Sequence, residues 1–116
     1  MSWRAIPNGS EVDLVGPVGD SLEVVITSSD TSYNWSGWTW TGQVRATPSS
    51  ASTVGTFTIT DTSSATALNL TAVVAATTTD DWTAGDTLVY AIQGTKSTSK
   101  ITFLEGKVIP KASIVR

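Results

Sequence analysis

The segment from residue 34 to residue 46 constrains the fold more than any other part of the chain. It holds three of the five tryptophans, and from residue 38 onward its large apolar side chains occupy alternate positions. The apolar series is Trp38, Trp40, Val44 and Ala46. Successive side chains of an extended strand point to opposite faces, so this pattern predicts a strand with one buried face.

Two roles fit the tryptophans of such a strand: a buried core, or a platform on which sugar rings stack. We place Trp38 and Trp40 in the core, because a small sandwich buries its largest side chains first. Trp35 lies in the polar turn before the strand, so we expect it to be the exposed aromatic contact. A carbohydrate-binding module that uses Trp35 therefore stays as one alternative function.

Hydroxyl side chains fill many of the polar positions, since Ser and Thr together make up nearly a third of the chain. Threonine is β-branched and favours a pleated, half-exposed surface. We therefore expect an all-β chain built mostly from antiparallel sheets, each with one solvated face.

Alternation and turn residues together predict about seven strands. They lie at residues 12–15, 22–27, 38–47, 56–60, 68–71, 87–92 and 101–109. Residues 87–92 have apolar side chains on both faces, which indicates a central strand. The predicted core comprises Trp38, Trp40, Val44, Phe57, Ile59, Leu68, Leu70, Leu88, Tyr90 and Ile92.

Residues 77–86 predict one short helical turn. A threonine N-cap followed by Asp80 and Asp81 in the first turn would satisfy free N–H groups and complement the helix dipole. Together with Asp86, these carboxylates could instead hold a calcium ion. They lack the spacing of an EF-hand, and capping explains the first two, so we expect neither a metal nor any other cofactor.

The composition excludes several classes of function. The chain has no cysteine and no histidine, which removes disulfide scaffolds, thiol catalysis and the commonest general base. Its other carboxylates are scattered singly, so we do not expect an enzyme. A net charge of -3 without a basic cluster argues against nucleic-acid binding. No apolar run approaches the ~20 residues of a membrane span, and the N-terminus lacks a secretory signal, so we expect synthesis in a cytoplasm.

The first nineteen residues are punctuated by glycine and proline and predict an N-terminal arm before a sandwich domain of residues 20–116. An arm of this kind cannot form a core alone, so it should dock on its own domain or on another subunit. We expect it to make intersubunit contacts in a symmetric homo-oligomer. Its predicted contact residues are Trp3, Ile6, Val12, Leu14 and Val15.

Five short motifs occur in a recognisable order along the chain. They are Gly37-Trp38, Gln43-Val44-Arg45, Leu68-Asn69-Leu70-Thr71, Gly85-Asp86 followed by Tyr90, and Gly106-Lys107-Val108. In this order the chain resembles the immunoglobulin-like N-terminal domain of phage upper-baseplate proteins and related phage tail proteins, over residues 20–116. The family's domain usually heads a longer chain, whereas we expect this copy to be complete.

The resemblance implies an immunoglobulin-like antiparallel sandwich and a bacteriophage virion structural protein. Such a module would act in the tail, in the baseplate or as an adaptor, through contacts with other virion proteins. A capsid decoration protein on the phage head is the second expectation for a short, acidic, cysteine-free chain. In either case the expected location is the virion, after synthesis in the host cytoplasm.

Overall fold

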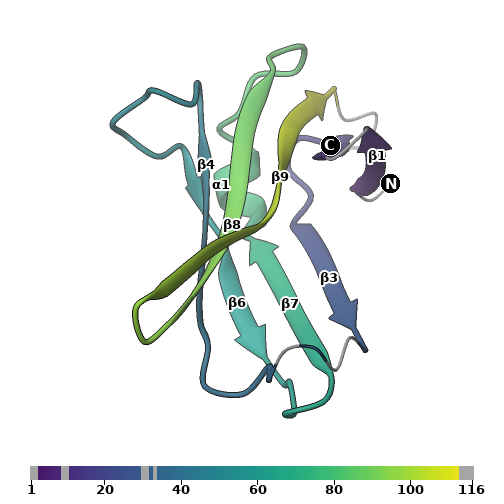
Figure 1. Cartoon of the computed structure of the whole chain (residues 1–116). Coiled ribbons are helices and arrows are strands. Elements are labelled where there is room, and N and C mark those ends of the chain that lie inside the picture. The colour runs from purple at the N-terminus through teal and green to yellow at the C-terminus, as the bar shows by residue number, and fades with distance from the viewer. Residues whose placement is uncertain (1–2, 9–10, 30–31, 33, 113–116) are drawn as a thin grey trace.

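Two β-sheets pack face to face, and a short helix lies between two of their strands in the chain (Figure 1). The computed structural model describes residues 3–8, 11–29, 32 and 34–112. The larger sheet has the order β1-β2-β9-β8-β4-β5, and the smaller sheet has the order β3-β7-β6. The predicted all-β sandwich is confirmed. Its central strand orders, β9-β8-β4 and β3-β7-β6, are those of an immunoglobulin-like sandwich.

Strand bounds follow the alternation of the sequence closely in the second half of the chain. The larger sheet contains β1 (Arg4–Asn8), β2 (Glu11–Pro17), β4 (Thr39–Arg45), β5 (Gly55–Thr56), β8 (Leu88–Lys96) and β9 (Ser99–Lys111). The smaller sheet contains β3 (Leu22–Ser28), β6 (Thr58–Asp61) and β7 (Leu68–Val74). As predicted, β8 is a central strand, because β9 and β4 flank it.

One pair of strands departs from the predicted antiparallel arrangement. Strand β2 runs parallel to β9, with Leu14 opposite Val108. A parallel pair cannot be joined by a tight hairpin, and these strands lie at opposite ends of the chain. This pair is the one parallel exception among the described strand pairs of a mostly antiparallel sandwich, and no hairpin sets its strand direction.

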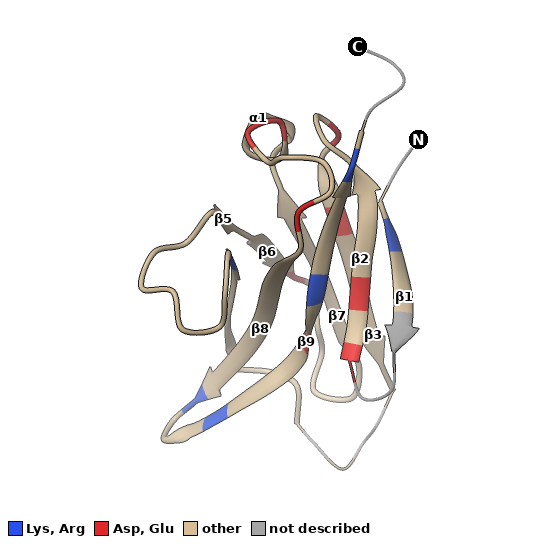
Figure 2. Ribbon diagram, turned by 90° about the horizontal axis from the view of Figure 1, so that it is seen from above, with Lys and Arg blue, Asp and Glu red and all other residues tan. Residues whose placement is uncertain are grey.

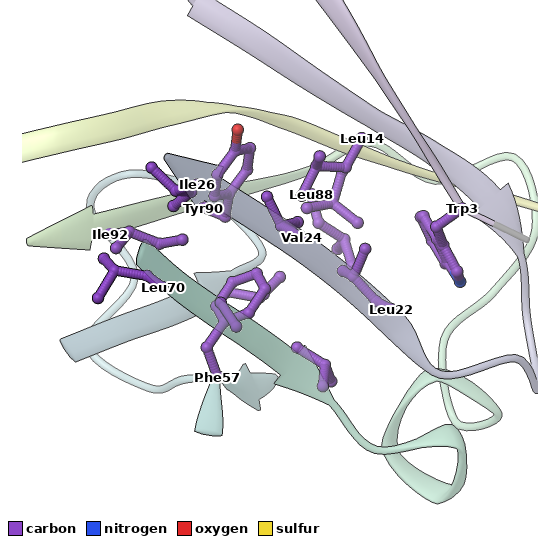
Figure 3. Close-up of a cluster of buried hydrophobic side chains, with 14 of the residues drawn as sticks. Trp3, Leu14, Leu22, Val24, Ile26, Phe57, Leu70, Leu88, Tyr90 and Ile92 are labelled. Carbon is purple, nitrogen blue, oxygen red and sulfur yellow. The ribbon is translucent and has the colours of Figure 1, made fainter. Parts of the chain in front are cut away.

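The core fills the space between the two sheets, and side chains from both point into it (Figure 3). Seven of the predicted core residues are buried: Val44, Phe57, Leu68, Leu70, Leu88, Tyr90 and Ile92. Trp40 and Ile59 are partly buried and pack against this cluster. Trp38 is half-buried and is not part of the cluster, so its placement in the core was wrong. Strand β4 begins at Thr39, so Trp38 lies just before the strand, and its ring packs against Trp40.

The predicted arm is part of the sandwich. Residues 4–8 and 11–17 form β1 and β2, and Trp3 and Leu14 are buried, with 8% and 1% of their surfaces exposed. Val12 and Val15 are half-buried, whereas Ile6 is 40% exposed. The predicted boundary after residue 19 therefore does not separate the arm from the core. In the single chain, Trp3 and Leu14 pack into the core of their own sandwich, and the predicted contact of this segment with another subunit stays a prediction.

The helical turn is present as α1 (Ala76–Thr79), but its ends differ from the prediction. Ala75 is the N-cap and makes no side-chain cap, while Asp80 is the C-cap. Thr79 is fully buried, and its Oγ1 accepts a hydrogen bond from the Gly19 N–H at 3.1 Å and lies 2.7 Å from the Asp20 carbonyl oxygen. The turn is thus positioned by its attachment to the β2–β3 connection. In the described part of the chain, no helix is long and apolar enough to cross a membrane.

Candidate interaction surfaces

The larger sheet carries a hollow of about 610 Å³ over β4, β8 and β9. Many of its lining side chains, such as Thr41, Gln43 and Gln93, come from the outward-facing positions of these strands, and Glu11 of β2 and Pro48 of the following loop complete it. Both signs of charge line it. They come from Glu11, Arg45, Lys100 and Glu105. Figure 2 shows acidic residues along β2 and basic residues on β8 and β9.

Arg45 shapes one wall of this hollow. Its guanidinium group donates hydrogen bonds to the Ser50 carbonyl oxygen at 2.6 Å and to Gln43 Oε1 at 2.7 Å. The bond to Ser50 holds the loop between β4 and β5 beside the strand. The lining therefore combines amides, hydroxyls and charges of both signs, a chemistry suited to hydrogen bonding with a polar protein segment.

Tyr90 also lines the hollow, and its side chain links two strands of the larger sheet. Its hydroxyl donates a 2.5 Å hydrogen bond to the Val12 carbonyl oxygen, which joins β8 to β2. Burial raises the pKa of Tyr90 well above its ordinary value of 10.0, and the carboxylates of Asp13, Glu11 and Glu105 raise it further, in that order. The phenol therefore remains a protonated hydrogen-bond donor at physiological pH and is unsuited to act as a general base.

Gly106 explains why the β2 backbone can lie so close to β9. A Cβ atom on Gly106 would overlap the carbonyl group of Val12. Nearby, the Lys107 N–H donates to Asp13 Oδ1 at 3.1 Å. Two of the motifs that carry the resemblance, those around Tyr90 and Gly106, thus have a shared structural role in attaching β2.

Trp35 is buried, with 2% of its surface exposed, so its predicted role as the exposed aromatic was wrong. Its backbone N–H donates to the Ala65 carbonyl oxygen at 3.2 Å, which draws the turn against the smaller sheet's β6–β7 connection. Its ring meets Phe103 edge-on, with centroids 5.8 Å apart. Phe103 in turn meets Trp40, with centroids 5.6 Å apart.

Trp38 takes the surface position instead. Its indole Nε1 donates to the Asn34 carbonyl oxygen at 2.9 Å, and the Lys96 ammonium lies 6.0 Å from its ring centroid. The ring also packs at a tilt against Trp40. Trp38 and Trp40 are the two tryptophans that are half-buried rather than buried.

The three carboxylates considered for an ion are all exposed and belong to the segment after α1. Within the residues that the structure describes, no group of three or more metal-ligating side chains converges. Asp80, Asp81 and Asp86 are therefore not brought together as a calcium site.

The residues that form the hollow were not predicted as a site. The sequence places Thr41, Gln43 and Arg45 on the polar side of a strand, a pattern that any solvated strand shows. One hint of the hollow is present in the sequence: the loop of small polar residues 48–53, which follows this strand and ends its alternation. The lining depends on β4, β8 and β9 lying side by side, which no single segment reveals.

No protein-family model matches the chain, and no curated protein matches it. The chain's own surfaces are therefore the basis for assigning it a role.

Proposed function

We propose that this chain is a bacteriophage virion structural protein, a non-catalytic tail, baseplate or adaptor module that acts through protein contacts. The observation that carries the proposal is the position of β1, which forms one edge of the larger sheet. An edge strand has one side free to pair with another chain. The exposed Ile6 side chain, at 40% exposure, lies on this strand.

The hollow on the same sheet supports a protein partner as well. Its mixed charges favour a polar segment with charges of both signs, and such complementary charges set the orientation of the partner. The motifs that resemble phage tail proteins favour other virion proteins, and further copies of the chain, as those partners.

The test is the copy number and location of the chain in purified virions, by quantitative mass spectrometry and cryo-electron microscopy. A few copies at the tail or its attachment point are the expected result. Coverage of the head would instead favour a capsid decoration protein, and absence from the particle would overturn the proposal.

A second candidate function, glycan binding, is favoured by the position of Trp38. It predicts quenching of tryptophan fluorescence by a glycan, and loss of that quenching in Trp38→Ala. Trp35→Phe is the matched control, because the Trp35 ring is buried and should not contact the ligand. Unchanged fluorescence across a broad panel of glycans would exclude this function.

A further inference from the structure

We propose that β1 is an exchangeable strand, so that residues 3–8 of one copy dock on β2 of a second copy during assembly. The incoming strand would take the place that the acceptor's own β1 occupies in the single chain. This inference rests on the proposed function as an assembly module, and it names a second copy of this chain as the partner.

Strand β1 is held to the rest of the sheet on one side only. It pairs antiparallel with β2, from Arg4 opposite Val15 to Asn8 opposite Glu11, and it is the last strand of the sheet. Arg4, Ala5 and Ile6 are all exposed. Their side chains lie outside the buried cluster, so Trp3 is the side chain that anchors this segment in the core.

Trp3 fits into a socket to which Gly16, Asp20 and Trp82, all outside β1, contribute. Its indole Nε1 donates to the Asp20 carbonyl oxygen at 3.2 Å, and its ring meets Trp82 edge-on, with centroids 5.9 Å apart and an angle of 88°. Gly16 provides the space, because a Cβ atom there would overlap the Trp3 ring. Figure 3 shows Trp3 at one end of the buried cluster, beyond Leu22.

The acceptor edge remains in place when β1 leaves. Strand β2 is held on its other side by β9, and the Val18 N–H donates to the Lys111 carbonyl oxygen at 3.0 Å. Tyr90 and Asp13 attach β2 to β8 and β9 as described above. The socket and the strand edge therefore do not depend on the chain that supplies β1.

A second copy is the occupant that fits best, because its β1 has the same sequence as the strand that it replaces. Every hydrogen bond and the Trp3 contacts would be remade in the exchanged pair, so the free energies of the two arrangements differ little. Binding sites on a virion would raise the local concentration of copies and shift the balance toward exchange.

Disulfide trapping in the full chain tests the exchange. The chain contains no cysteine, so any disulfide that forms must join the introduced thiols. Arg4 and Val15 are directly opposite each other, at a Cα separation that a disulfide can bridge. The Arg4→Cys and Val15→Cys variants, mixed at high concentration under mild oxidation, should give more covalent dimer on a non-reducing gel than either variant alone, because only the mixture can join position 4 to position 15.

The matched control uses Val89→Cys and Lys107→Cys, which are directly opposite each other on the central strands β8 and β9. These strands should not separate, so their mixture should give only background dimer. We expect the heterodimer of the first mixture to exceed the control by roughly tenfold, because docking gives the two thiols a high effective concentration. Equal yields from the two mixtures would overturn the exchange.

The double variant R4C/V15C provides a second, independent readout. When oxidised within one chain, it locks β1 on its own β2, and circular dichroism should show that the fold is kept. The locked form should fail to assemble with further copies of the chain, and reduction of the disulfide should restore this assembly. Normal assembly of the locked form would contradict the exchange and leave the virion location untouched, whereas absence from virions would contradict the proposed function alone.

Discussion

Strands β1 and β8 belong to the same sheet but are held by very different sets of contacts. Strand β8 lies between two neighbours and buries Ile92 completely, whereas β1 has one neighbour and leaves Ile6 40% exposed. The centre of the sheet provides stability, and its N-terminal edge is free to make contacts with another chain. The difference arises from position in the sheet, because both strands contain apolar residues.

The largest expected effect is at the centre. Ile92→Ala should lower the free energy of unfolding by ~2 to 5 kcal/mol, because it leaves a cavity in the core. Urea unfolding followed by circular dichroism measures the loss. Val25→Ala is the control, because Val25 is 59% exposed and its truncation should change stability little. Similar losses for the two variants would contradict the assigned core.

Trp3→Ala should have a smaller effect on global unfolding, about 2 kcal/mol, because β1 can open without the rest of the sheet. A buried tryptophan at the centre would lose ~3 to 5 kcal/mol on truncation. Amide exchange should then be faster in residues 4–8 and unchanged in β8. Equal acceleration in both strands would show that Trp3 supports the whole core.

Gly16→Ala should imitate the loss of Trp3, since the added methyl group takes the space of the indole ring. We expect a loss of about 1 to 2 kcal/mol in the natural background, within the usual range for overpacking. In a Trp3→Ala background the same substitution should cost less, because the overlap with the ring is gone and only the close approach to the residue 3 Cα, at 2.7 Å, remains. Additive losses in this double-mutant cycle would rule out the socket.

Tyr90→Phe should cost about 1 kcal/mol through the lost hydrogen bond to the Val12 carbonyl oxygen. The pH dependence gives a further check. Because burial raises the pKa of Tyr90 above its unfolded value of 10.0, its contribution to stability is fully present below that pH and is lost as the pH rises above it. Natural protein should therefore lose stability more steeply than Tyr90→Phe in alkaline urea titrations, and parallel curves would contradict the burial of the phenol.

Period-two alternation was sufficient to predict most of the sandwich. It located β3, β7 and β8 and identified buried residues such as Leu70 and Ile92. Alternation reports which face of a strand a side chain occupies, and it does not report how far the strand extends beneath the opposite sheet. Trp38 fits the alternation of the sequence, yet it lies just before β4, which begins at Thr39.

The remaining errors involve contacts between distant segments. Trp35 is buried because its turn bonds to Ala65, and Trp3 is buried because Gly16 leaves room for its ring. Ala65 and Gly16 lie far along the chain from the tryptophans they contact, and no local pattern of the sequence links them. The hollow on the larger sheet was missed for the same reason, because its lining is assembled from several strands.

Native-state amide exchange of the purified chain, followed by mass spectrometry, tests the contrast between β1 and β8 most directly. The detachable-strand account predicts that amides of residues 4–8 exchange by local opening, much faster than those of residues 88–96 in the central strand. Equal protection of both strands, at the rate of global unfolding, would show that β1 does not detach and would contradict its exchange between copies.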